Sequence, residues 1–278
     1  MKQNFWHKIK TLWELIIILE NIFIILILLA SLYSLTLSKG IDNFYFVISF
    51  QKLKEEPWFL IILSFLSFFI FFLRVKVLQC SLNRFEENVN FKEALRLLLQ
   101  IDVRRAFSPI GLISSISFFN KEKNPIKGIK PFIYNQFIFA IGDWLFYLLI
   151  LLFLWKNIFI LLFLLSLLII VIYFFQPKDF IGLFFAIAEG APRLILFILI
   201  FYLFNINANF NQIVYIYIAW DFSSAITPVL FGAGISELIA TIVSFFVGVP
   251  FQLTLLPLFV ARIFIVYLPL TLFFYKPS

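Results

Sequence analysis

Residues that build metal centres and soluble active sites are nearly absent from this sequence. It contains one cysteine, Cys80, and one histidine, His7. A lone cysteine forms no intramolecular disulfide, and one cysteine with one histidine is too few for a zinc cluster. The sequence also has no Gly-rich phosphate loop and no nucleophile elbow. We therefore expect no metal, no cofactor and no redox chemistry, and any acid–base catalysis would have to use carboxylates.

Charged residues are scarce as well, and this shortage indicates the class of protein. Asp, Glu, Lys and Arg make up 13% of the 278 residues, about half of their share in soluble domains. Apolar residues make up 63%, with 41 Phe among them. A water-soluble fold would have too little polar surface, so we predict an all-α, polytopic integral membrane protein. Since each span takes about 20 residues, we expect 1–278 to form a single transmembrane domain.

Hydropathy predicts about eight crossings, the first of which is too long for a signal-peptide core. The sequence from 42 to 56 is mixed in polarity, as in a helix that lies on the membrane surface. Two further segments, 91–101 and 107–119, are too short to cross. Because Asp102, Arg104 and Arg105 separate them, we expect two half-helices that enter from one face. The predicted spans are 15–37, 58–79, 131–155, 157–175, 180–204, 211–230, 234–249 and 251–274.

The placement of basic residues predicts the topology. Eleven Lys and Arg residues lie between positions 74 and 130. The positive-inside rule puts this block, and with it both termini, on the cytoplasmic side of the inner membrane. The net charge of +7 is spread beside apolar spans, so we expect it to face anionic lipid and not nucleic acid.

Glycine and proline interrupt two short apolar segments. The segment 234–249 would extend about 24 Å as a helix, which is less than the hydrocarbon thickness. A similar pattern occurs in SPIGLISSISFF (108–119), either by chance or as an inverted repeat of the kind that surrounds transporter sites. We expect broken or re-entrant helices that line a cavity. The residues of this motif are Pro109, Gly111, Pro228, Gly232, Gly234, Gly248 and Pro250.

Several ionisable residues fall inside predicted spans, where each costs roughly 2.5–3.5 kcal/mol. Glu189 and Arg193 have the i, i+4 spacing of an intrahelical ion pair. Asp143 would either contact a cation or head group or pair with a buried arginine. Glu237 would either cap its helix or pair with Arg262, which is too deep to reach the interface. The predicted buried polar site comprises Asp143, Glu189, Arg193, Asp221, Glu237 and Arg262.

A basic cluster is predicted beside the half-helices, formed by Arg74, Lys76, Arg104 and Arg105. Guanidinium groups suit bidentate contact with phosphate. Arg74, Arg104 and Arg105 would therefore bind a lipid phosphate, or else they only set the topology.

The order of residues in TPVLFGAGISE…VGVP…VAR is similar to a known family pattern. Pro228, Gly232, Gly234, Glu237, Gly248 and Arg262 resemble the Pro-Gly-Gly-x-Gly-x-x-Glu…Gly-Val…Arg pattern of the lysylphosphatidylglycerol synthase transmembrane region. That family is also described as flippase-like. Arg74 in RVKVL and Asp143 match two further positions. The sequence differs at Phe231, where the family has the first glycine of a pair, and its motif after the second span is reduced to SPIG.

The resemblance implies translocation or presentation of a lipid by a stand-alone member without an aminoacyltransferase domain. We therefore expect a membrane protein that binds and flips an anionic lipid, either a phospholipid or a polyprenyl-phosphate-linked glycolipid. Two other classes stay open. One is an intramembrane enzyme in which Asp143, Asp221 or Glu237 acts as acid or base on a lipid-linked substrate. The other is an accessory subunit without chemistry. A homo-oligomer, or assembly with a partner enzyme, is compatible with each.

Overall fold

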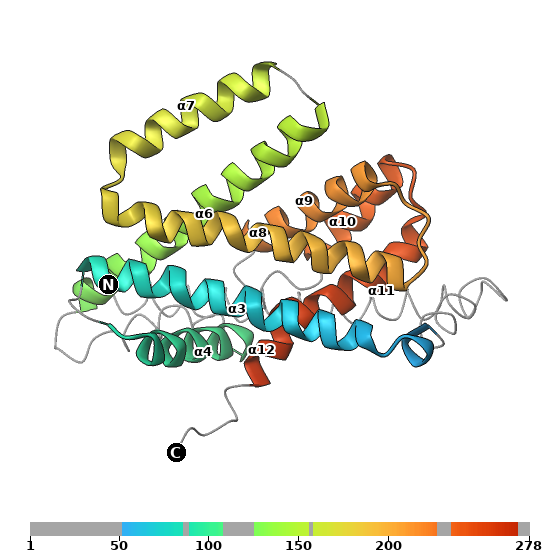
Figure 1. Cartoon of the computed structure of the whole chain (residues 1–278), viewed down its shortest axis with the longest axis horizontal. Coiled ribbons are helices and arrows are strands. Elements are labelled where there is room, and N and C mark those ends of the chain that lie inside the picture. The colour runs from blue at the N-terminus through green and yellow to red at the C-terminus, as the bar shows by residue number, and fades with distance from the viewer. Residues whose placement is uncertain (1–51, 86–88, 108–124, 156–157, 227–234, 272–278) are drawn as a thin grey trace, which may run out of the picture.

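The computed structural model describes residues 52–85, 89–107, 125–155, 158–226 and 235–271 (Figure 1). Within these ranges the chain is helical apart from short connections and contains no strand, which agrees with the predicted all-α class. The helices are α3 (Trp58–Phe85), α4 (Phe91–Phe107), α6 (Pro125–Trp155), α7 (Ile158–Phe174), α8 (Pro177–Leu203), α9 (Phe210–Ile226), α10 (Ile235–Phe246), α11 (Phe251–Arg262) and α12 (Leu268–Leu270), with a π-helical segment, Ile263–Tyr267, between the last two.

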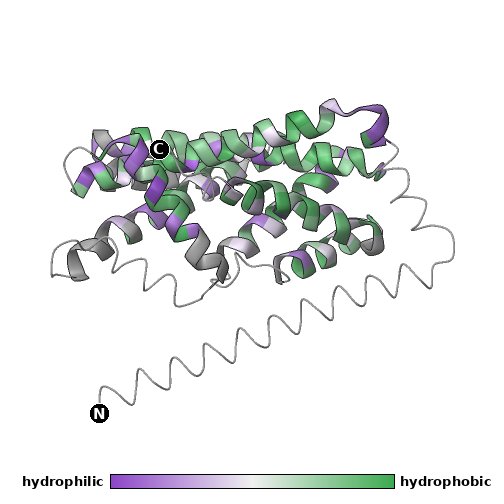
Figure 2. Cartoon of the chain, turned by 90° about the horizontal axis from the view of Figure 1, so that it is seen from below, coloured by the Kyte–Doolittle hydropathy of each residue, from purple (hydrophilic) through white to green (hydrophobic). Residues whose placement is uncertain are grey.

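Four helical segments of the described chain are long and apolar enough to cross a membrane. They are Trp58–Phe85, Ile133–Trp155, Asp179–Leu203 and Leu253–Leu270. Their outward surfaces carry many exposed large apolar side chains, among them Ile61, Phe65 and Phe153. Most of the described helical ribbon in Figure 2 has the green colour of apolar residues. Such continuous apolar surface is expected where lipid is the solvent, and the fold is that of a helical membrane protein.

Helices α3 and α8 lie side by side along much of their length at the centre of the fold (Figure 1). Helix α6 packs on both of them, and α9 packs mainly on α10. The largest apolar core lies between α3, α6, α8, α9 and α11, where Phe197, Phe201 and Trp220 are fully buried. This arrangement brings the polar residues of α3, α6, α8 and α9 to one interior region.

The prediction of a helix break at 102–105 is wrong. Helix α4 continues from Phe91 to Phe107 through Asp102 and both arginines. No Gly or Pro interrupts this stretch, and Arg is a good helix former, so the charges alone do not end the helix. Residues 108–119 of the predicted second half-helix, the predicted first span 15–37 and most of 42–56 lie outside the described residues. The count of eight crossings stays a prediction.

The predicted break before Pro250 is confirmed. Helix α10 has only 12 residues, and Gly248 follows it with a φ of +83°. A residue with a side chain would be strained there, whereas glycine adopts this conformation readily. The Val249 amide donates to the Ser244 carbonyl at 2.8 Å, which closes the helix end. From α9, Gln212 Nε2 donates to the Val247 carbonyl at 2.7 Å, so this turn is tied to the neighbouring helix.

Candidate functional site

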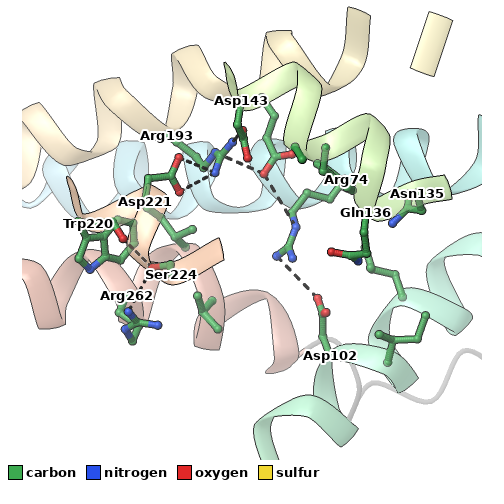
Figure 3. Close-up of a pocket in the computed structure, with 17 residues that line it drawn as sticks. Arg74, Asp102, Asn135, Gln136, Asp143, Arg193, Trp220, Asp221, Ser224 and Arg262 are labelled. Carbon is green, nitrogen blue, oxygen red and sulfur yellow. Dashed lines mark hydrogen bonds and ion pairs between the residues drawn. The ribbon is translucent and has the colours of Figure 1, made fainter. Parts of the chain in front are cut away.

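Charged side chains from α3, α4, α6, α8, α9 and α11 meet around one interior cavity (Figure 3). The cavity has a volume of about 330 Å³. Its charged lining residues are Arg74, Asp102, Asp143, Glu189, Arg193, Asp221 and Arg262, and Glu237 lies behind Arg262 as its ion-pair partner. Five of the six predicted buried polar residues therefore line one cavity, and the sixth, Glu237, pairs with one of them.

Arg193 on α8 is the centre of this network. Its Nη1 donates to both carboxylate oxygens of Asp221, at 2.7 and 2.9 Å, and its Nη2 donates to Asp143. On its own helix, Glu189 Oε1 lies 3.5 Å from Arg193 Nε, so the predicted i, i+4 pair is present. Tyr147 donates a further hydrogen bond of 2.7 Å to Asp221. Asp143 thus partners a buried arginine, as the second of the two sequence readings expected.

Close packing of α6 on α8 makes these contacts possible. A Cβ atom added to Gly142 would lie 2.5 Å from the Cβ of Ala186, and one added to Gly190 would overlap the ring of Phe146. Small residues at a helix crossing let the two backbones approach. Because Gly142 precedes Asp143, this approach places the carboxylate within reach of Arg193.

Arg74 on α3 is held more loosely than Arg193. Its Nη1 lies 3.7 Å from Asp102 Oδ2, and its Nε lies 3.9 Å from Glu189 Oε1. Both carboxylate side chains are 3% exposed, whereas 19% of the Arg74 side chain is exposed. Arg74 therefore bridges α4 and α8 through two long ion pairs and keeps part of its surface open. Figure 3 shows its guanidinium group reaching between Asp102 and the α8 carboxylate.

The predicted pair of Glu237 and Arg262 is present. Arg262 Nε donates to Glu237 Oε1 at 2.5 Å, and the two residues are 1% and 0% exposed. Trp220 Nε1 donates to the same carboxylate oxygen at 3.0 Å. The Arg262 guanidinium group lies 5.3 Å from the Trp220 ring centroid and also contacts Ser236. Glu237 thus accepts hydrogen bonds from Arg262 and Trp220 in a buried cluster, as expected for the ion pair with Arg262.

Apolar side chains also line the cavity, among the charged ones. Leu98 and Ile101 come from α4, as Asp102 does, and Ile265 and Val266 come from the π-helical segment that follows Arg262. A π-helical turn leaves backbone carbonyls misaligned, and here the Ser67 hydroxyl of α3 donates to the Phe264 carbonyl. The lining is therefore mixed, with charged and apolar side chains from the same parts of the chain.

Part of the predicted site cannot be placed in this arrangement. The backbones of Arg104 and Arg105 belong to α4, but their side chains lie outside the described part of the structure. Lys76 does not line the cavity, and its Nζ lies 5.0 Å from the ring centroid of Phe91. The other residues outside the described ranges are Pro109, Gly111, Pro228, Gly232 and Gly234.

Sequence reasoning missed several members of the network. Asp102 was interpreted as a break between half-helices, although it is buried and pairs with Arg74. Tyr147 and Tyr217 both donate to Asp221 and were not singled out. A sequence signal for the tyrosines existed, because Tyr147 follows Asp143 and Tyr217 precedes Asp221 by four residues, which places each pair on one helix face.

The charges of the described network do not balance. It contains three guanidinium groups and five carboxylates, which leaves two negative charges in excess when all are ionised. Burying uncompensated charge is costly. Among the described residues, no His, Cys, Asp or Glu group is arranged to hold a metal ion. The long ion pairs of Arg74 can exchange partners with a polar ligand.

Comparison of the chain with protein-family models, curated proteins and solved structures finds no match. The site is therefore interpreted from its own geometry.

Proposed function

We propose that this chain binds an anionic lipid, a phospholipid or a polyprenyl-phosphate-linked glycolipid, and translocates its head group through the interior cavity. The observation that supports this proposal best is the state of Arg74, an arginine on a candidate span with two ion pairs of 3.7 and 3.9 Å and an open side-chain surface. A guanidinium group held at such distances can exchange a carboxylate for a phosphate and form two parallel hydrogen bonds with it.

The mixed lining of the cavity suits an amphiphile. Its charged side chains would receive the head group, and its apolar side chains, Leu98 and Ile265 among them, would contact the first part of a chain. A cavity of about 330 Å³ is at the small end of ligand pockets and would hold a head group but not a whole lipid. The acyl or polyprenyl chains would stay in the bilayer against the exposed apolar surface of the helices.

The resemblance to the lysylphosphatidylglycerol synthase transmembrane region supports the same class of function. In this proposal the chain crosses the inner membrane about eight times, with both termini and the basic block 74–130 in the cytoplasm. Arg104 and Arg105 would then attract anionic lipid from the cytoplasmic leaflet toward Arg74.

Lipid translocation is tested with the purified chain in liposomes that contain fluorescent phosphatidylglycerol. Replacing Arg74, Arg104 and Arg105 together by Gln is expected to reduce translocation at least tenfold, whereas a fluorescent neutral lipid is unaffected. Arg96→Gln is the matched control, because Arg96 is an exposed arginine on the same helix as two of the three. Wild-type translocation and lipid selectivity in the triple variant would refute the proposal.

Intramembrane catalysis on a lipid-linked substrate is the second candidate. Buried carboxylates in a cavity favour it in general. Asp143 and Asp221, however, are both engaged by Arg193, and Glu237 is engaged by Arg262. Carboxylates fixed in this way are better suited to holding the fold than to transferring protons. Product formation in the same liposomes, lost in Asp143→Asn, would favour the enzyme over the transporter.

A further inference from the structure

Glu189 is held by long contacts in the part of the chain that the structure describes. Its side chain is 3% exposed and lines the cavity, yet its Oε2 has no hydrogen-bond partner among the described residues. Its Oε1 lies 3.5 Å from Arg193 Nε and 3.9 Å from Arg74 Nε. An ionised carboxylate at such a depth normally accepts several short hydrogen bonds. Glu189 therefore has little beyond two distant guanidinium groups to stabilise its charge.

The charges around Glu189 come from every helix that faces it. Arg193 shares its helix α8, and the neighbouring helices contribute Arg74 from α3, Asp102 from α4, Asp143 from α6, Asp221 from α9 and Arg262 from α11. Arg193 and Arg262 are already engaged in short contacts with other carboxylates. The remaining guanidinium group, Arg74, is thus shared between Glu189 and Asp102.

Binding of a phosphate at Arg74 would add a negative charge to a network that already contains two more carboxylates than guanidinium groups. The phosphate would also take the Arg74 donors that now face Glu189. An uncompensated carboxylate in a membrane interior is unstable, and the simplest way to remove its charge is to bind a proton. Glu189 and Asp102 would each lose a contact to Arg74 in this exchange, and among its described ion pairs Glu189 would keep the 3.5 Å contact to Arg193 Nε.

We propose that Glu189 takes up a proton from water when the phosphate of an anionic lipid binds Arg74, and releases it when the phosphate leaves. This coupling rests on the lipid function proposed above and extends it. Protonated Glu189 has an O–H donor that can bond the phosphate or a cavity water, so the proton also supplies the hydrogen bond that the ionised group lacks. Lipid binding and proton binding would then favour each other, as linked equilibria require.

The test uses the full chain in a neutral detergent and dioctanoyl phosphatidylglycerol as the probe. Its phosphodiester stays singly charged between pH 6 and 8, so any pH dependence comes from the protein. If one proton is taken up with each lipid, the affinity is expected to fall about tenfold for each unit by which the pH rises. This slope applies over the pH range in which Glu189 is ionised in the free protein and protonated in the complex. Calorimetry in buffers of different ionisation enthalpy should show an uptake of about one proton per lipid.

Glu189→Gln mimics the protonated side chain and is expected to bind the probe with the same affinity from pH 6 to 8. Glu55→Gln removes an exposed carboxylate outside the network and should keep the wild-type pH dependence. The wild-type calorimetry shows whether a proton is taken up even where Glu189→Gln does not fold. A pH dependence that persists in folded Glu189→Gln would assign the proton to another group and overturn the role of Glu189. Binding that is independent of pH, with no proton uptake, would overturn the coupling and leave the lipid function standing. Absence of binding at every pH would overturn both.

The free head group, glycerophosphoglycerol, is titrated in parallel. Much weaker binding than that of the lipid probe is the expected result, because the apolar side chains of the lining would contribute only with a chain present. Equal affinity would mean that a free phosphodiester is the ligand, which overturns the lipid part of the proposal.

Discussion

Replacement of Glu237 by Gln is the most direct test of the buried network. The change keeps the size of the side chain and an oxygen that can accept from Trp220 Nε1, but it removes the charge opposite Arg262. Glu237 and Arg262 are both essentially inaccessible to solvent, and Arg262 Nε lies 2.5 Å from Glu237 Oε1. Breaking a buried pair by removing one partner costs about 3–5 kcal/mol, since the other charge is left uncompensated. We therefore expect a loss of this size in the free energy of unfolding.

The double variant Glu237→Gln, Arg262→Met measures the interaction energy between the two residues apart from their contacts with other groups. Removing both charges takes away both members of the pair, and replacement of a buried pair by residues of similar volume is often close to neutral. The double variant should therefore be more stable than Glu237→Gln alone, with a coupling energy of about 2–3 kcal/mol. Additive losses would refute the reasoning, because they would show that the two charges do not stabilise each other.

Denaturant unfolding in mixed micelles, followed by tryptophan fluorescence, measures these values. Trp220 contacts both members of the pair, so its emission reports on this region directly. Glu55→Gln serves as the control, because an exposed surface substitution usually changes stability by less than about 0.5 kcal/mol. The loss in Glu237→Gln should persist at high salt, since a buried pair is screened little by ions.

Of three further predictions, two follow from the geometry of the network and the third from the distribution of basic residues. Gly142→Val should force α6 away from α8 and weaken the ion pairs of Arg193, with a loss of about 1–3 kcal/mol in the same unfolding assay; wild-type stability would contradict the close helix approach. Tyr147→Phe removes a hydrogen bond to the Asp221 carboxylate and should cost about 1.5–3 kcal/mol, and an unchanged unfolding midpoint would argue against that bond. A cysteine introduced at Lys123 should react with an impermeant thiol reagent only from the cytoplasmic side, and labelling from the outside alone would reverse the predicted topology.

The sequence predicts those features of the fold that depend only on residues close together in the chain. Long apolar runs predict the helices because lipid requires every backbone group to bond within its own segment. The pair of Glu189 and Arg193 follows from their separation by four residues. Gly248 and Pro250 predict the end of α10 because few other residues allow that turn. Each of these inferences needs only neighbouring residues.

The remaining contacts of the site depend on helix packing, which the sequence does not give. The depth of Asp143 and Asp221 shows that each needs a partner, but not that both partners are the same arginine. Arg74 and Asp102 belong to segments whose relative position depends on how α4 lies against α3. The interpretation of Asp102 as a helix break failed for the same reason, since its burial became acceptable only through a tertiary partner.

The network contains two tightly held arginines, Arg193 and Arg262, and one loosely held arginine, Arg74. We expect the first two to stabilise the fold and the third to contact a ligand. Arg193 and Arg262 make short contacts to carboxylates that further side chains fix in place, so a ligand would gain little by replacing those partners. Arg74 makes no ion pair shorter than 3.7 Å among the described residues and is the most exposed of the three. Removing the first two should therefore damage the fold before binding can be measured. Removing Arg74 takes away only long ion pairs, so Arg74→Gln should cost less stability than loss of Arg193 or Arg262, although it leaves Asp102 and Glu189 beside fewer positive charges. A translocation defect in Arg74→Gln with an unfolding midpoint close to wild type would report on ligand contact, and a large loss of stability would assign Arg74 to the fold.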